Sequence, residues 1–99
     1  GYITRQALER KVVRRVIFEI VLPEGDDAVG LVGGKPRIEG PHVEGHAPKV
    51  SLQSFVVPRE ATADRAVAEW VVRAPRGTTL GLVARCERAG VVRAEVTLD

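Results

Sequence analysis

The part of the chain that decides the fold is residues 66–99, whose sequence is AVAEWVVRAPRGTTLGLVARCERAGVVRAEVTLD. Apolar residues fall on alternate positions in three successive runs, which is typical of strands that bury one face. The three runs are Ala68, Trp70, Val72 and Ala74; Leu80, Leu82, Ala84 and Cys86; and Val92, Ala94, Val96 and Leu98. Short glycine-containing connections at 75–77 and 88–90 separate the runs, and such connections predict hairpins.

In the rest of the chain, alternating or continuous apolar residues predict further strands at 12–22, 29–32, 37–43 and 49–57. The run 12–22 is the longest and predicts a central strand that is covered on both sides over part of its length. Turns are expected at 23–27 and 33–36, because Pro and Gly there interrupt a strand ladder.

Residues 4–11 predict a short helix of about two turns, with Thr4 as its N-cap and good helix formers behind it. About seven short strands, with turn signals roughly every 8 to 12 residues, are typical of a sandwich. We therefore expect an all-β, immunoglobulin-like two-sheet sandwich with one short amino-terminal helix, formed by residues 1–99 as a single domain. The chain begins at Gly1 rather than Met, so we expect it to be a fragment of a larger protein or a processed product.

The composition favours an ordinary globular domain, with 44% apolar residues, 28% charged residues and a net charge of +2. Basic residues gather near the amino terminus, but the interleaved aromatic residues expected of nucleic-acid binding are missing. These basic residues are Arg5, Arg10, Lys11, Arg14 and Arg15. No apolar run is long enough to span a membrane, and no signal-like segment is found. The sequence therefore predicts neither a nucleic-acid partner nor a membrane partner.

Cys86 is the single cysteine, so the fold does not depend on an internal disulfide or an oxidising compartment. Its position on the apolar face of a strand indicates a small hydrophobe rather than a nucleophile. The localisation is left unknown, with secretion or a periplasmic location as the options considered.

The sharpest cluster of chemistry-bearing residues is His42, Glu44 and His46. A zincin carries H-E-x-x-H on a helix, so that two imidazoles meet one metal ion. Here an extended strand would hold the two imidazoles roughly 13 Å apart, since each residue rises about 3.3 Å. Two loop histidines are therefore favoured over a metal site, and these three residues are weak metal-ligand candidates. No catalytic or cofactor-binding residue is predicted.

Two other features have a simpler structural interpretation. The glycines at 30–34 precede Lys35, but Pro36 stands where a phosphate-binding loop needs Ser or Thr, so a tight turn is the better interpretation. Trp70 could stack on a sugar if it were exposed, yet its alternation with neighbouring apolar residues indicates a core position.

Four segments resemble the carboxy-terminal region of bacterial zinc carboxypeptidases of the carboxypeptidase A-like family. They are GYITRQALERK at 1–11, LVGGKPRIEGPHVEGH at 31–46, EWVVRAPRGTT at 69–79 and RAGVVR at 88–93. In such proteins a catalytic zinc domain precedes a β-sandwich tail. The family's H-x-x-E zinc motif does not occur in this chain, because Gly45 stands three places after His42, so none of its catalytic residues is carried over. Pro41 and His46 also replace the Gly and Arg that the resemblance leads us to expect.

The resemblance implies a non-catalytic accessory domain that supports the catalytic domain of a metallopeptidase, a hydrolase, or recognises a partner. Zinc is then expected only in that catalytic domain, which is the expected partner, and not in this chain. The resemblance also implies that strands precede Gly1 in the parent, so an exposed edge is expected to pair with another chain or a second copy. The alternative is a free-standing immunoglobulin-like adhesion or carbohydrate-binding module.

Overall fold

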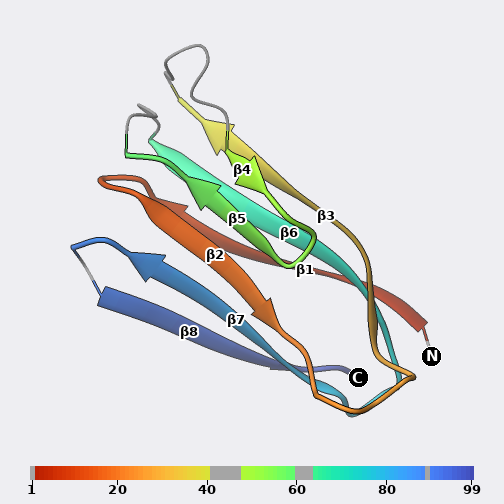
Figure 1. The fold of residues 1–99 in the computed structure, drawn as a ribbon. Coiled ribbons are helices and arrows are strands. Elements are labelled where there is room, and N and C mark those ends of the chain that lie inside the picture. The colour runs from red at the N-terminus through yellow and green to blue at the C-terminus, as the bar shows by residue number, and fades with distance from the viewer. Residues whose placement is uncertain (1, 41–47, 60–63, 89) are drawn as a thin grey trace.

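The computed structural model describes residues 2–40, 48–59, 64–88 and 90–99, which form eight strands in two antiparallel sheets (Figure 1). The strands are β1 (Tyr2–Lys11), β2 (Val16–Val21), β3 (Gly30–Glu39), β4 (Lys49–Val50), β5 (Ser54–Val57), β6 (Arg65–Ala74), β7 (Thr79–Cys86) and β8 (Gly90–Thr97). One sheet has the order β1-β6-β3 and the other the order β4-β5-β2-β7-β8. The predicted all-β, two-sheet architecture is confirmed, and no described segment forms a helix that could cross a membrane.

The helix predicted at 4–11 is wrong, because these residues belong to β1. Their side chains alternate between half-buried and exposed positions, as in a strand. β1 pairs with β6 along its whole length, from Tyr2 opposite Ala74 to Lys11 opposite Arg65. A two-turn helix is marginal by itself, whereas pairing with β6 satisfies the backbone of every second residue and buries one face.

Three predictions in the middle of the chain need correction. The strand expected at 12–22 begins only at Val16, although β2 does lie centrally, between β5 and β7. The turn predicted at 33–36 is wrong, because β3 runs through it with a bulge between Leu31 and Gly33. Pro36 is tolerated there because β3 is an edge strand. The strand predicted at 49–57 is two strands, β4 and β5, which pair with each other.

The connections around β7 differ from each other. β7 and β8 form the predicted hairpin, with Cys86 opposite Gly90. The hairpin predicted at 75–77 is wrong, because this segment carries the chain from β6 in one sheet to β7 in the other. Gly77 has a φ of 84°, a conformation that favours glycine, and its N–H donates to the Leu98 carbonyl oxygen at 2.7 Å.

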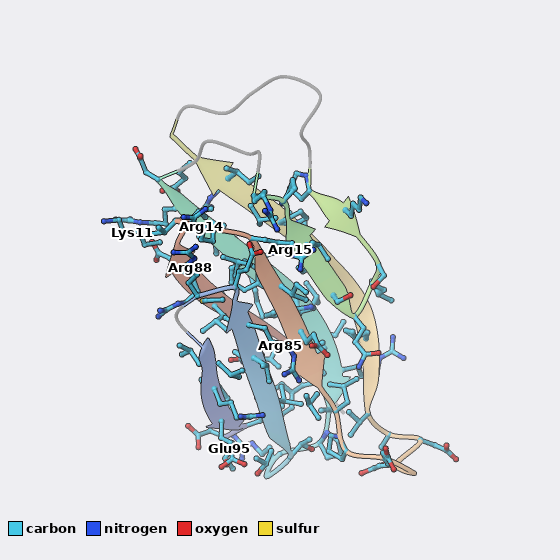
Figure 2. The ribbon with its side chains drawn as sticks, turned by 60° about the vertical axis from the view of Figure 1, so that its left-hand side comes forward. Lys11, Arg14, Arg15, Arg85, Arg88 and Glu95 are labelled. Carbon is cyan, nitrogen blue, oxygen red and sulfur yellow. The ribbon has the colours of Figure 1, made fainter. Side chains whose placement is uncertain are left out.

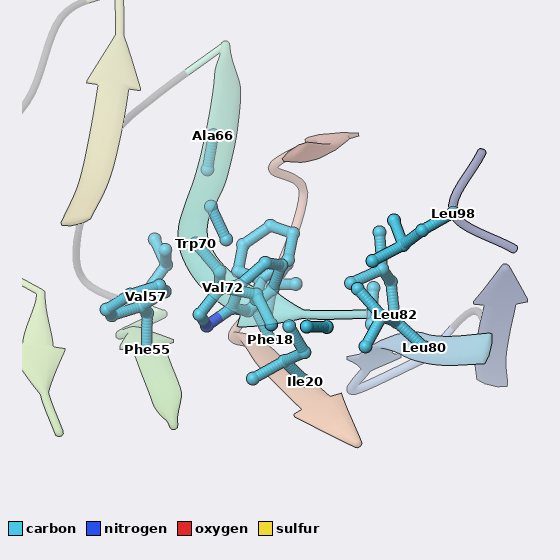
Figure 3. Packing of buried hydrophobic residues seen from close by; sticks show 14 residues of the cluster. Phe18, Ile20, Phe55, Val57, Ala66, Trp70, Val72, Leu80, Leu82 and Leu98 are labelled. Carbon is cyan, nitrogen blue, oxygen red and sulfur yellow. The ribbon is translucent and has the colours of Figure 1, made fainter. Parts of the chain in front are cut away.

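The core lies between the sheets and is centred on Trp70, which is 0% exposed (Figure 3). The Trp70 ring from β6 stacks on the Phe55 ring from β5, with centroids 5.5 Å apart and an interplanar angle of 24°. Around this pair lie inward-facing residues of β2, β5, β6 and β7, together with Leu98. The alternating pattern of 66–98 therefore predicted the buried face correctly, and Trp70 is not a surface platform for a sugar.

Candidate functional site

The metal-ligand candidates of the sequence, His42, Glu44 and His46, lie outside the described residues. Within the described ranges, no three His, Cys, Asp or Glu side chains gather in a way that could hold a metal ion. Cys86, expected to be a buried hydrophobe, is half-buried and forms part of a cavity wall. That cavity is the candidate functional site.

A cavity of about 470 Å³ lies where the end of β1, the start of β2 and the β7–β8 turn meet. Five basic residues line it and are called the basic corner from here on: Arg10, Lys11, Arg14, Arg15 and Arg88. Figure 2 shows four of them, Lys11, Arg14, Arg15 and Arg88, gathered at one end of the molecule, with Glu95 at the other end. The remaining lining residues are Val13, Val16 and Cys86.

The basic corner exists because the chain changes sheets there. β1 ends at Lys11 in the three-stranded sheet and β2 begins at Val16 in the five-stranded sheet, so the intervening residues cross between the layers. The Glu87 N–H donates to the Arg15 carbonyl oxygen at 3.1 Å, which fixes the β7–β8 turn against this crossing. The crossing and the turn together bring Arg88 to the arginines of the amino-terminal segment.

The cavity combines its cations with apolar surface. Among its lining residues, Val13 is 73% exposed, which is a high value for a valine, and Val16 is 1% exposed. The Nε atom of Arg10 is buried and has no hydrogen-bond acceptor among the described residues. A buried donor without an acceptor costs about 1–3 kcal/mol, so a ligand oxygen at this atom would be stabilising.

Ion pairs distinguish the basic corner from several other arginines of the described surface. Several arginines elsewhere lie beside carboxylates, for example Arg65 with Glu9 at 2.7 Å, Arg85 with Glu19 at 2.9 Å and Arg59 with Glu87 at 2.7 Å, whereas others such as Arg76 have no ion pair among the described residues. None of the five basic-corner residues forms an ion pair with another described residue. The cations of the basic corner are therefore not neutralised by ion pairs with described carboxylates and are available to an anionic partner.

This arrangement is suited to binding rather than to proton transfer. Arginine stays protonated in proteins and presents a fork of N–H donors that matches carboxylate oxygens. The valines beside it can contact an apolar part of the same ligand. The cluster from Arg10 to Arg15 is visible in the sequence, whereas only the folded hairpin adds Arg88.

Comparison with known proteins identifies one family. A family model described as "Domain of unknown function (DUF8731)" matches residues 1–97. No curated protein and no solved structure matches the chain.

Proposed function

The chain belongs to the DUF8731 family, and we propose that this domain is a non-catalytic recognition module that binds an acidic protein partner at the basic corner. The observation that carries the proposal is the gathering of five cations around one apolar-walled cavity, without ion pairs to other described residues. Carboxylates of a partner would supply the missing counter-charges and the acceptor that Arg10 Nε lacks.

We propose further that the acidic partner is the catalytic domain of a parent protein that resembles a zinc carboxypeptidase. This part rests on the sequence resemblance alone, and any zinc would belong to that domain. The test is the gene sequence upstream of Gly1. A zinc peptidase domain with an H-x-x-E motif would support the proposal, and an upstream domain of another kind would overturn it.

We propose a two-sheet sandwich that does not have the immunoglobulin strand order. Immunoglobulin domains keep their first two strands in one sheet, whereas β1 and β2 lie in different sheets here. The alternative function, a carbohydrate-binding or adhesion module, is less well supported because the single tryptophan, Trp70, is buried.

Binding of a poly-L-glutamate peptide to the chain tests the recognition proposal. We expect Arg14→Glu and Arg88→Glu each to weaken binding by about tenfold or more, which corresponds to about 1.4 kcal/mol. Arg76→Glu is the matched control, since Arg76 is an exposed arginine in the segment between β6 and β7, at the end of the β7–β8 hairpin away from the corner. Equal weakening by all three substitutions would mean that only net charge matters and would overturn the proposal.

A further inference from the structure

β1 has one unpaired edge. Its backbone N–H and C=O groups can be divided into those that face β6 and those that face this free edge. The Val12 N–H donates to the Asp64 carbonyl oxygen at 3.2 Å, so even-numbered residues direct their backbone groups toward β6. Residues that bond to the neighbour alternate with residues that do not in an antiparallel pair. The odd-numbered residues therefore direct their N–H and C=O groups to the free edge: Ile3, Arg5, Ala7, Glu9 and Lys11.

The sheet edges differ in how well they are protected against an added strand. β3 carries Pro36, which has no N–H to offer, and a bulge near Gly33. β4 has only two residues. β1 offers ten residues without proline, glycine or a bulge, so it is a better template for strand addition than β3 or β4.

The other sheet extends beyond β1 on this side. β7, which packs against β1, is followed outward by β8. The inward-facing Val92, Ala94 and Val96 of β8 are only half-buried, because the three-stranded sheet ends before it covers them. The space beside β1 and over β8 is therefore about one strand wide, near 4.8 Å.

We propose that this edge of β1 accepts one extended strand from the acidic partner, and that the strand covers the inner face of β8. Its backbone would pair with the odd-numbered residues of β1, and alternate apolar side chains would contact Val92, Ala94 and Val96. A second copy of this chain that pairs antiparallel through its own β1 does not fit, because its five-stranded sheet would occupy the place of β8.

The two ends of the β1 edge determine which end of the added strand is acidic. At one end the Tyr2 hydroxyl donates to the backbone oxygen of Asp99 at 2.6 Å, which joins β1 to the residues after β8. At the other end β1 leads through Lys11 into the basic corner. The acidic residues of the strand therefore lie beside Lys11, and this assignment rests on the proposed function of the corner.

The experiment uses the whole chain and a synthetic acetylated peptide that begins with Glu-Glu and continues with alternating Val and Thr, because antiparallel pairing with β1 places its amino end beside Lys11. A peptide with the same residues in scrambled order is the control. Hydrogen exchange followed by NMR should show slowed exchange at the amides of Arg5, Ala7 and Glu9 with the first peptide only. Ala7→Pro removes one free-edge N–H and should weaken binding at least tenfold.

The matched control for Ala7→Pro is Val91→Pro on the free edge of β8. The Leu98 N–H donates to the Thr78 carbonyl oxygen at 2.9 Å, so odd-numbered residues of β8 also face outward. Val91→Pro should leave binding unchanged. Circular dichroism verifies that both variants are folded, and the amide protection in the unaltered chain tests the proposal without any variant.

The possible outcomes separate this inference from the function on which it rests. Equal binding of both peptides without protection of β1 amides would overturn strand addition and leave the basic corner intact. Protection that Arg14→Glu does not weaken would support strand addition and contradict the corner. Protection that increases with protein concentration alone would show that a second copy takes the edge, and no binding at all would overturn the inference.

Discussion

Gly34 shows how closely the two sheets approach each other around the aromatic pair. A Cβ atom added at this position would lie 2.9 Å from Phe55 Cζ, 3.2 Å from the Glu69 carbonyl oxygen and 3.3 Å from Trp70 Cδ1. The Phe55 ring is fully buried and stacked on Trp70, so it has little room to move. The missing side chain at Gly34 is thus a requirement of core packing.

We expect Gly34→Ala to lower the free energy of unfolding by about 1–3 kcal/mol, the usual cost of overpacking a core. Gly33→Ala is the matched control, because an added Cβ there has no neighbour within 4 Å. Urea denaturation of the two variants measures the difference. Equal stabilities would contradict the observed packing of β3 on β5.

Trp70→Ala should lower the free energy of unfolding by about 3–5 kcal/mol, because it removes the largest side chain of the core. The same denaturation experiment measures the loss. A loss below about 1 kcal/mol would mean that the ring does not hold the sheets together.

At the scale of elements, β1 shows why the sequence predicted a helix at 4–11 where the structure has a strand. An interior strand reveals itself by alternating apolar residues, as β6 does in 66–74. β1 lies at an edge where the second sheet extends outward, and its inward face carries the polar residues Thr4, Gln6 and Arg10. Its alternation is therefore one of burial and not of hydrophobicity, and helix propensity alone gave the wrong prediction.

Proline substitutions in β1 test its assignment as a strand. Gln6→Pro should cost about 1–3 kcal/mol, because it removes an N–H that faces β6 and leaves a buried acceptor without its donor. Ala7→Pro should change stability by about 0.5 kcal/mol, as at an ordinary surface position, because its N–H faces the free edge. Thermal unfolding measures both variants. In a helix over 4–11 both residues would lie in the first turn, where proline is tolerated, so the two substitutions would then have similar small effects.

At the scale of the whole molecule, the sequence predicted two packed β layers and the buried face of the last three strands. It could not predict which connections change sheets, because the glycine-containing segments 75–77 and 88–90 look alike, yet only the second closes a hairpin. For the same reason the sequence indicated only the amino-terminal part of the basic corner. Arg88 joins Arg14 and Arg15 through tertiary structure, more than seventy residues along the chain.

The unpaired cations of the basic corner predict that binding of an acidic partner depends on salt. Association with poly-L-glutamate should weaken steadily as sodium chloride rises, because the Debye length falls from about 10 Å at 0.1 M to about 3 Å at 1 M. Titration calorimetry at increasing salt measures this effect. Affinity that does not change with salt would indicate that apolar contacts dominate.

The most direct test is an NMR titration of the whole chain with the Val-Thr peptide that carries Glu-Glu. The chemical shifts of the backbone amides of Arg14, Arg88 and Ala7 are compared with that of Arg76. We expect the amide signals of Arg14, Arg88 and Ala7 to shift with the same dissociation constant and the amide signal of Arg76 to stay unchanged. Shifts of similar size at Arg76, or shifts that leave out Arg14 and Arg88, would contradict this expectation.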